Sequence, residues 1–374
     1  MTVHLVTRKF EDPAAFVTRM ITYAKGFAAC GARVHLHFLM PNSSRLRLEN
    51  APEGVTVHHL WENDGFLSRK IRVLSRGSSL RKLDRMIMGG DVIFAYNEER
   101  AVLRHLLRHR GRATIITEAG EHPFYGGASL GKRLALRDRM RMILKTDLLL
   151  TVSQSLAAYF TGLGMDASKV RVINTFVDRD RFRPWAEKCR GRRFYTIAYC
   201  GTVSRHKDGV DDLIRAFGIF HRTHPEWRLK IIGRGEISRM QDFARQEGVA
   251  EFVDFTGGMP SARMPELLCQ ADICALARPS SLQATHGFPS KLGEYISTER
   301  PCVITDVGDI GLFLKDGETA SVVPPDNPET FASALCRVAD DYDAALEVAG
   351  NATRLLEYEF SAEEQIRQLL KDIE

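Results

Sequence analysis

The sequence predicts an α/β fold of two doubly wound, Rossmann-like domains, each a parallel sheet covered by helices on both faces. Three observations predict it. Short apolar runs alternate with helical stretches, which is typical of parallel βαβ units. This pattern restarts after a polar stretch near residues 182–192. A chain of 374 residues is also long enough to bury two hydrophobic cores.

In the first half, the apolar run VHLVT is followed by a helical pattern from about Pro13 to Ala29, which Gly31 ends. The opening segment MTVHLVTRKFEDP is too short and too polar for a signal peptide, so we expect a first strand there. Further strands are expected in RVHLHFLM, DVIFAY, ATIIT, DLLLTVS and VRVINTFVD. These elements predict a first domain over residues 1–183.

In the second half, strands are expected in YTIAYCGTV, WRLKIIGRG, VDFTGG, DICALA, PCVIT and ASVVPP. Between them, DGVDDLIRAFGIFHRTHP and MPELLCQA have helical patterns, and Pro225 ends the first of these. These elements predict a second domain over residues 192–355. The last segment, FSAEEQIRQLLKDIE, predicts a helix with Ser361 as its N-cap and Glu364 three residues later.

Composition excludes several classes of protein. The chain is 44% hydrophobic and 26% charged, and it has no run of eighteen apolar residues that could span a membrane. Its seven cysteines include no CxxC pair. This scattered set favours reduced thiols in a cytoplasmic protein over a disulfide framework or a zinc site.

Charge is distributed unevenly. The net charge is +5, yet residues 1–190 carry 32 Lys and Arg against 18 Asp and Glu, a balance of +14, and the remainder carries −9. A basic half can contact an anionic surface such as lipid, nucleic acid or a phosphorylated acceptor, or it can simply have a solvated basic face. No recognised nucleic-acid-binding module is visible, so we expect no nucleic acid partner.

The segment HGFPSKLGEY, residues 286–295, predicts an anion-binding site. Proline suits the first turn of a helix, and the N–H groups that follow it are unpaired and lie at the positive end of the helix dipole. Gly287 would allow a ligand to approach the main chain. A diphosphate fits such a helix start, although an ordinary loop-to-helix junction would look the same.

Two more segments repeat this pattern. In CGTVSRHKDGVDDLI, a strand ends at Gly201, a loop carries Arg205 and Lys207, and a helix begins near Gly209. In IIGRGE, a strand ends in a pair of glycines, of which Gly233 is the first. Ligands of open parallel sheets bind outside the carboxyl ends of the strands, where all three segments are expected to lie.

From about residue 147 to the end, the chain resembles the retaining group 1 glycosyltransferases of family 4, which have the GT-B fold. The resemblance rests on the order of the three segments above, on VDFTGGMPSARMPELLCQADICALA between them, and on EYISTERPCVITDVG after them. It implies two domains that face a cleft, with residues 356–374 forming a helix that crosses back to the first domain. It also implies a nucleotide-sugar donor held by the second domain and an acceptor held by the first.

The resemblance assigns roles to individual residues. Glu294 matches the second glutamate of the family's Glu-x7-Glu signature and is expected to bind ribose, whereas His286 stands where the family has its first glutamate. A histidine can bond a sugar hydroxyl but offers no carboxylate to a developing positive charge. The expected donor-binding residues are Gly201, Arg205, Lys207, Gly233, Gly287, Phe288, Pro289, Ser290, Lys291 and Glu294. No metal or other cofactor is expected, because the cations of the chain would neutralise the phosphates.

In the first domain, the strand end IITEAGEHPFYGG carries groups that could act on an acceptor. Glu118, Glu121 and His122 are the candidates, and Glu118 and His122 join His286 as the expected catalytic residues. Each of them could equally have an ordinary role in a loop.

Two basic amphipathic stretches, LSRKIRVLSRGSSLRKLDRMIM and LGKRLALRDRMRMILK, could lie on an anionic bilayer or could bury their apolar stripe in the core. We therefore expect a cytoplasmic glycosyltransferase with a lipid-linked or polysaccharide acceptor. Peripheral association with the cytoplasmic face of a membrane is left open. The alternatives are a sugar-nucleotide 2-epimerase on the same fold and a non-catalytic sugar-nucleotide-binding protein.

Overall fold

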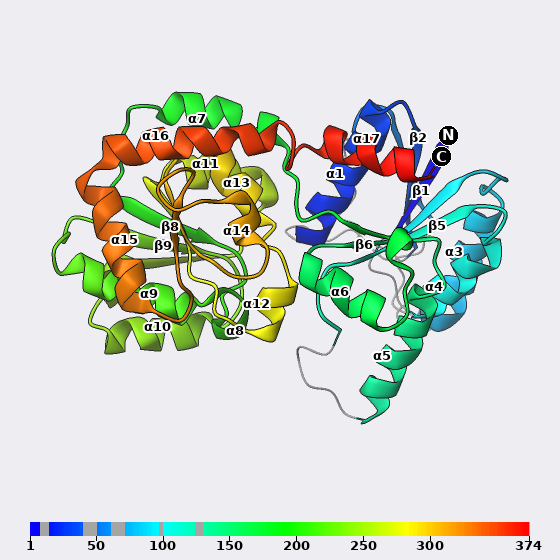
Figure 1. Cartoon of the computed structure of the whole chain (residues 1–374), viewed down its shortest axis with the longest axis horizontal. Coiled ribbons are helices and arrows are strands. Elements are labelled where there is room, and N and C mark those ends of the chain that lie inside the picture. Colours follow the sequence, from blue (N-terminus) through cyan, green and yellow to red (C-terminus); the bar gives the residue numbers. More distant parts are fainter. Residues whose placement is uncertain (8–14, 40–50, 61–71, 97–99, 124–129, 374) are drawn as a thin grey trace. The chain divides into compact units, whose positions relative to one another are not determined.

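The computed structural model describes residues 1–7, 15–39, 51–60, 72–96, 100–123 and 130–373. The chain forms two compact units (Figure 1). The first unit comprises residues 1–173 together with 362–374, and the second comprises residues 174–361. The division at residue 173 lies ten residues before the expected end of the first domain.

The first unit is built on a parallel sheet, whose strand order in the described part of the chain is β3-β2-β1-β4-β5-β6-β7. The strands are β1 (Thr2–Thr7), β2 (Arg33–Phe38), β3 (Val55–His59), β4 (Val92–Tyr96), β5 (Thr114–Ala119), β6 (Leu148–Thr151) and β7 (Val170–Val172). All neighbouring pairs run parallel. Every expected strand of this half is confirmed, while β3 was not expected.

The helices of the first unit are α1 (Ala15–Ala29), α3 (Arg72–Asp84), α4 (Arg100–Leu106), α5 (Leu130–Ile143), α6 (Gln154–Gly162) and α17 (Ala362–Ile373). The last helix packs along α1 (Figure 1), where a Cβ on Gly26 would lie 2.8 Å from Cγ1 of Ile366. Buried Ile366 and Leu369 form its inner face. The C-terminal helix is therefore an integral part of the first unit.

The second unit contains a parallel sheet of strand order β10-β9-β8-β11-β12-β13 within residues 174–361. Its strands are β8 (Thr196–Cys200), β9 (Arg228–Ile232), β10 (Val253–Gly257), β11 (Ile273–Leu276), β12 (Cys302–Thr305) and β13 (Ser321–Val323). Each matches an expected strand. The sequence therefore predicted both parallel sheets, which confirms the fold class.

Helices cover both faces of this second sheet. Helices α9 (Val210–His221), α10 (Ile237–Gln246) and α15 (Pro328–Asp340) lie on one side, where α9 packs against α10 and α15 (Figure 1). The other helices are α7 (Arg183–Cys189), α8 (Arg205–Asp208), α11 (Met264–Cys269), α12 (Leu282–His286), α13 (Lys291–Ser297), α14 (Ile310–Phe313) and α16 (Tyr342–Ala352). The polar stretch near residues 182–192 contains α7, which buries Ala186 and Cys189 and packs on α11.

Four histidines form a stack on one face of the first sheet. The rings of His37 and His58 lie 4.7 Å apart and those of His4 and His35 lie 5.3 Å apart. Ring nitrogens of His4 and His37 are 3.0 Å apart, those of His35 and His58 are 2.9 Å apart, and His4 also contacts Asp91 at 3.1 Å. Burial lowers the pKa of all four rings, and for His37 the neighbouring histidines lower the pKa further. The stack is therefore neutral in the folded unit at neutral pH.

We expect this stack to make the first unit sensitive to acid. A histidine whose pKa is lower in the folded than in the unfolded state binds its proton mainly after unfolding, so stability falls as the pH drops below the unfolded value of about 6.5. Each extra proton adds at most about 1.4 kcal/mol per pH unit to that slope. Hydrogen exchange of the β1–β3 amides between pH 7 and pH 5, corrected for intrinsic exchange rates, measures how the stability of the first unit changes with pH.

The matched variants separate this effect from general acid sensitivity. His37→Asn should flatten the slope even if it lowers the overall stability, because it removes one titrating group. His206→Asn removes an exposed histidine of the second unit and should leave the slope unchanged. An unaltered slope in His37→Asn would show that the stack does not control acid stability.

Candidate functional site

The centre of the candidate site is a buried charged pair beneath the end of β8. The ammonium Nζ of Lys291, the first residue of α13, donates to Oδ2 of Asp208 at 2.7 Å. The hydroxyl of Tyr199 donates to the same oxygen at 2.8 Å and lies 3.4 Å from the ammonium. Burial alone would raise the pKa of Asp208, but the charges of Lys291 and Arg278 and the hydrogen bonds keep it below its usual value. Lys291, expected on the donor, is thus already bound to a carboxylate.

Gly201 and Gly233 bring two strand ends into contact above this pair. The residue Gly233 has φ +157°, and a Cβ there would lie 1.7 Å from the carbonyl oxygen of Gly201. A Cβ on Gly201, at φ +156°, would lie 2.2 Å from Nζ of Lys291. Any larger residue would therefore displace the main chain or the buried ammonium. The glycines are required by the close packing of β8, β9 and Lys291.

The loop after β8 forms a short helix, α8, before α9 begins at Val210 as expected. Ser204 caps α8 by accepting from the backbone N–H of Lys207 at 3.3 Å. Arg205 pairs with Asp211 at 2.9 Å, although the Arg205 side chain remains 56% exposed. The Ser281 hydroxyl before α12 donates to the carbonyl of His206 at 2.6 Å. This bond ties the basic loop to the helix that carries His286.

The segment HGFPS joins α12 to α13. His286 ends α12, and its Nδ1 lies 3.1 Å from the carbonyl oxygen of Leu282. The N–H of Gly287 closes the same helix on Gln283 at 3.0 Å, and the Phe288 ring packs against Phe313 with centroids 5.6 Å apart. These contacts give Gly287 and Phe288 structural roles in positioning the segment.

Helix α13 starts two residues later than expected. It begins at Lys291, after Pro289 and Ser290, and spans only Lys291–Ser297. The carbonyl of Pro289 accepts from the N–H of Leu292 at 3.0 Å, which is the first hydrogen bond of the turn. The expected helix start at Pro289 is therefore wrong, because Pro289 and Ser290 form the turn that leads into the helix.

Glu294 lies one helical turn after Lys291, so both side chains project from the same face of α13. Burial raises the pKa of Glu294, while the nearby charges of Arg181 and Lys291 act against this rise. Lys291, Gly201 and Gly233 therefore meet at the carboxyl ends of β8 and β9, and Glu294 projects from the same face of α13 as Lys291. The basic loop of α8 and the end of α12 lie next to each other at the adjoining edge.

Several known proteins resemble this chain over most of its length. Glycogen synthase of Mycobacterium tuberculosis is 28% identical over 246 residues, which are 65% of this chain and 58% of that protein. A GDP-mannose-dependent phosphatidylinositol monomannoside mannosyltransferase of Mycolicibacterium smegmatis is 28% identical over 262 residues, which are 67% of this chain and 68% of that protein. The chain thus spans about three fifths of the synthase.

Solved structures share its fold. Anabaena HepE in complex with UDP-glucose superimposes with a TM-score of 0.73 at 17% identity, covering 99% of both chains. WaaG, a glycosyltransferase involved in lipopolysaccharide biosynthesis, gives 0.68 at 14% identity, covering 98% of this chain and 99% of that one. Residues 17–181 match the model of Glycosyltransferase Family 4, and residues 195–341 match that of Glycosyl transferases group 1. The chain belongs to the GT-B glycosyltransferases.

In the first unit, Glu118 is buried in an ion pair. Its Oε1 accepts from Nε of Arg19 at 2.8 Å, and the same guanidinium donates to the carbonyl of Ile173 at 2.7 Å. The side chains of Arg19 and Glu118 are 9% and 3% exposed. His122 is also buried, with its ring 4.5 Å from that of Tyr159, and Glu121 is half-buried. The geometry gives Glu118 a structural partner in Arg19.

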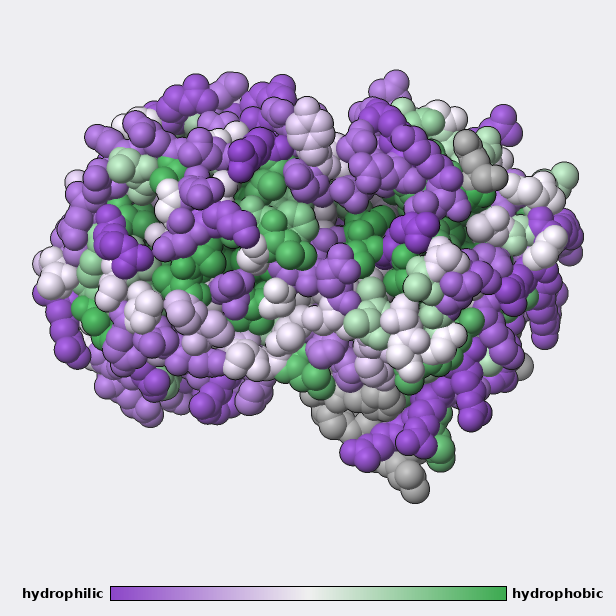
Figure 2. Space-filling view, in the orientation of Figure 1, coloured by the Kyte–Doolittle hydropathy of each residue, from purple (hydrophilic) through white to green (hydrophobic). Residues whose placement is uncertain are grey.

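The described parts of the two basic stretches lie largely on α3 and α5. The apolar residues Leu80, Leu83 and Ile87 from the first stretch and Met140 and Ile143 from the second are buried, so these positions belong to the core. The outer surface of α4 and α5 is largely hydrophilic (Figure 2). Positions before residue 72 in the first stretch lie outside the described residues. Over the described ranges, no helix is both long and apolar enough to cross a membrane.

Sequence reasoning missed Asp208, Tyr199 and Arg278 of the second unit. Arg278 is 2% exposed and donates to the carbonyl of Ala284 at 3.0 Å. The only signal for Asp208 was its place directly after Lys207 in a charged loop, and nothing distinguished it from a solvated carboxylate.

Proposed function

We propose that this protein is a retaining glycosyltransferase that moves a sugar from a nucleoside-diphosphate sugar to a lipid-linked or polysaccharide acceptor, without a metal cofactor. The observation that carries the proposal is the contact of Lys291 with Gly201 at the carboxyl ends of the strands of the second unit, with Glu294 one turn further along α13. Ligands of open parallel sheets bind at that edge. HepE, which shares the fold, was solved with UDP-glucose, which supports a nucleotide-sugar donor.

The cations of the second unit would bind the diphosphate. An ammonium carries three N–H groups, and among the described residues Lys291 donates to Asp208 and Tyr199. The third N–H would donate to a phosphate oxygen. Lys207 and the exposed Arg205 extend from α8, where they add point charge and a forked donor. These charges would stabilise the departing diphosphate, which is the role a metal ion has elsewhere.

Glu294 and His286 would contact the rest of the donor. The carboxyl group of Glu294 would accept from ribose hydroxyls. His286, whose Nδ1 lies 3.1 Å from the carbonyl oxygen of Leu282 at the end of α12, would bond a sugar hydroxyl. His286 would thus contact the sugar, while Lys207 and Lys291 contact the phosphates.

The reaction breaks the bond between the anomeric carbon and the oxygen of the second phosphate. The sugar passes through an oxocarbenium-like state, the acceptor oxygen forms the new bond, and the acceptor proton is released with the nucleoside diphosphate. Stabilisation of the leaving group carries most of the catalysis. No side chain is assigned as the nucleophile.

The acceptor belongs to the first unit. The +14 balance of residues 1–190 supports an anionic acceptor or an anionic membrane surface at the cytoplasmic face. The mannosyltransferase of M. smegmatis carries the name of a phosphatidylinositol acceptor, which supports a lipid-linked class.

Two variants test this function together. Lys207→Ala should weaken the binding of nucleoside diphosphates by about 1.5–3 kcal/mol, roughly a 10- to 150-fold rise in Kd, because a charged hydrogen bond is lost. His286→Ala should leave that Kd unchanged and lower the turnover of the sugar nucleotide, because the bare diphosphate has no sugar to contact. Calorimetric titration measures the first effect, and release of nucleoside diphosphate measures the second.

Lys230→Ala, a cation on β9, is the matched control and should behave like the parent protein. If no nucleoside diphosphate binds to the parent protein, the proposed function is wrong. If binding occurs but is insensitive to both Lys207→Ala and Glu294→Gln, the site lies elsewhere.

A further inference from the structure

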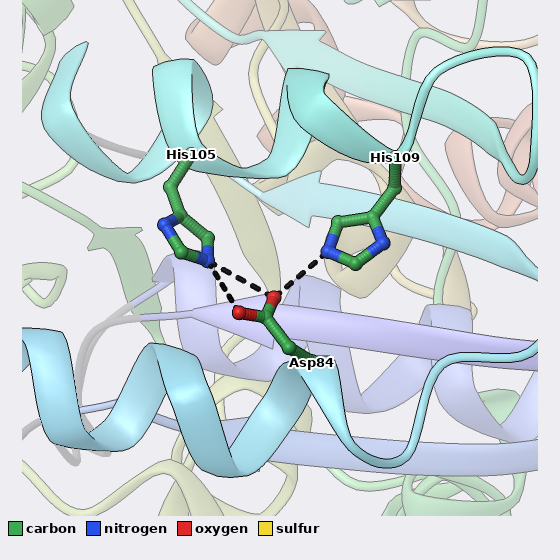
Figure 3. A group of neighbouring side chains, drawn as sticks. All are labelled: Asp84, His105 and His109. Carbon is green, nitrogen blue, oxygen red and sulfur yellow. Dashed lines mark hydrogen bonds and ion pairs between the residues drawn. The ribbon is translucent and has the colours of Figure 1, made fainter.

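The first unit carries a second group of chemically active side chains, which the proposed transfer reaction does not use. Nε2 of His105 lies 2.9 Å from Oδ1 and 3.0 Å from Oδ2 of Asp84, and Nε2 of His109 lies 2.8 Å from the same Oδ1 (Figure 3). Within the described ranges, this is the group of three His, Cys, Asp or Glu residues whose ligand atoms all lie within 4.8 Å of one another.

Two neighbouring helices bring the three residues together. Asp84 is the last residue of α3, whereas His105 lies in α4 and His109 ends the short 3-10 helix Leu107–His109 that continues it. A spacing of four places both imidazoles on one helical face. In Figure 3 both rings point from their helix towards the carboxylate.

The helices hold this arrangement before any ligand arrives. Buried Leu83 fixes α3 and buried Leu106 fixes α4, directly beside Asp84 and His105. The segments that follow them are joined as well: the Arg112 guanidinium donates to the carbonyl of Ile87 at 2.8 Å, and the N–H of Gly90 donates to the carbonyl of Arg112 at 2.9 Å. The three ligand atoms therefore sit on a rigid frame.

The distances suit a metal ion. Around a tetrahedral ion with bonds of about 2.0–2.1 Å, neighbouring ligand atoms lie roughly 3.3 Å apart. Each imidazole nitrogen would therefore move away from the carboxylate oxygen by about half an ångström, and the two Nε2 atoms already lie within 4.8 Å of each other. Two imidazoles and one carboxylate are ligands of Zn²⁺ and similar transition metals rather than of Ca²⁺ or Mg²⁺. Three protein ligands leave a fourth position for water.

The surroundings allow an ion to enter. The side chains of Asp84, His105 and His109 are 32%, 17% and 12% exposed. Two arginines near the histidines are paired with carboxylates, Arg104 with Asp138 and Arg110 with Asp147, both at 2.9 Å. These pairs reduce the repulsion that an incoming cation would meet.

We propose that Asp84, His105 and His109 bind a divalent transition-metal ion of the zinc type, which clamps α3 to α4 in the first unit. The carboxylate and the two Nε2 atoms are the ligands, and the ion replaces the protons that hydrogen-bond them in its absence. The ion is structural and takes no part in donor binding.

Titration of chelator-treated full-length protein with Co²⁺ and Zn²⁺ tests the proposal. We expect one ion per chain, a Co²⁺ visible spectrum without the charge-transfer band of a thiolate, and a rise in melting temperature with saturating Zn²⁺. The thiolate band matters because the chain has seven free cysteines that could bind zinc. None of these readouts depends on transferase activity.

The variants His105→Asn, His109→Asn and Asp84→Asn should each weaken Zn²⁺ binding at least tenfold and abolish the shift in melting temperature. His224→Asn is the matched control, because His224 also contacts an aspartate, Asp340, at 3.1 Å, but it belongs to no such group of three ligands among the described residues. It should bind Zn²⁺ like the parent protein. Circular dichroism and retained nucleoside diphosphate binding would show that the variants fold.

The proposal is overturned if the parent protein takes up no Zn²⁺ or Co²⁺ at micromolar concentrations. It is also overturned if His105→Asn and His109→Asn keep the parent affinity, or if the Co²⁺ spectrum shows thiolate ligands. A loss of stoichiometric binding in the three variants but not in His224→Asn would support it.

Discussion

Replacing Lys291 with alanine is expected to lower the free energy of unfolding of the second unit by about 3–5 kcal/mol, because removal of one partner leaves a buried charge without compensation. The side chains of Lys291 and Asp208 are 10% and 3% exposed. Within the described part of the chain, the Asp208 carboxylate would then accept a hydrogen bond only from the hydroxyl of Tyr199. Urea unfolding followed by the fluorescence of Trp185 and Trp227, in a Trp61→Phe background, measures the loss.

The double variant Asp208→Asn with Lys291→Met is the matched control. It removes both charges while an amide oxygen still accepts from Tyr199, so it should recover much of the stability that Lys291→Ala loses. Both variants should bind nucleoside diphosphate more weakly, because the ammonium is absent from each. A loss below about 1 kcal/mol in Lys291→Ala would mean that water reaches Asp208 and that the pair is not a buried one.

Replacing Glu118 with alanine should destabilise the first unit by a similar amount, about 3–5 kcal/mol. Arg19 would keep its bond to the Ile173 carbonyl but would lose its carboxylate partner in a buried position. Hydrogen exchange of amides in α1 and β5 measures the effect, and β9 amides in the second unit serve as the internal reference.

Glu118 was expected to act in catalysis, and a second variant separates the two roles. Arg19→Met combined with Glu118→Leu removes both charges and should be more stable than Glu118→Ala. If this double variant also keeps the parent turnover, Glu118 is a structural residue. If it is stable but inactive, the carboxylate takes part in the reaction. If the single and double variants are equally unstable, the Arg19–Glu118 ion pair is not what stabilises the first unit.

The sequence was a good guide to the sheets for a simple physical reason. Parallel strands covered on both faces must be apolar along their length, so DVIFAY and DICALA are visible as strands without any knowledge of their neighbours. Strand β3 was not predicted because its sequence, VTVHH, ends in histidines, which count as polar residues in a hydrophobicity pattern. The partial burial of His58 depends on stacking against His35 and His37 of β2, and those contacts exist only after folding.

Only those features of the candidate site that are formed by residues adjacent in the sequence were predicted. A glycine at the end of a strand and a basic loop after it are visible in the sequence, and they led to Gly201 and Lys207. The Lys291–Asp208 pair joins residues 83 positions apart, so no sequence spacing could indicate it. The same limit applies to the metal group, since the i, i+4 histidines are visible whereas Asp84 reaches them only through the packing of α3 beside α4.

The place of α17 has a consequence for how the chain folds as it is synthesised. The first unit needs this helix to cover α1, where Ile366 and Leu369 are buried, yet the helix is encoded after the whole second unit, residues 174–361. At a synthesis rate of 5–20 residues per second, α1 waits about 10–40 s for its partner after residue 173 has been added. The second unit can therefore complete its core on the ribosome before the first unit does, which reverses the usual order from N-terminus to C-terminus.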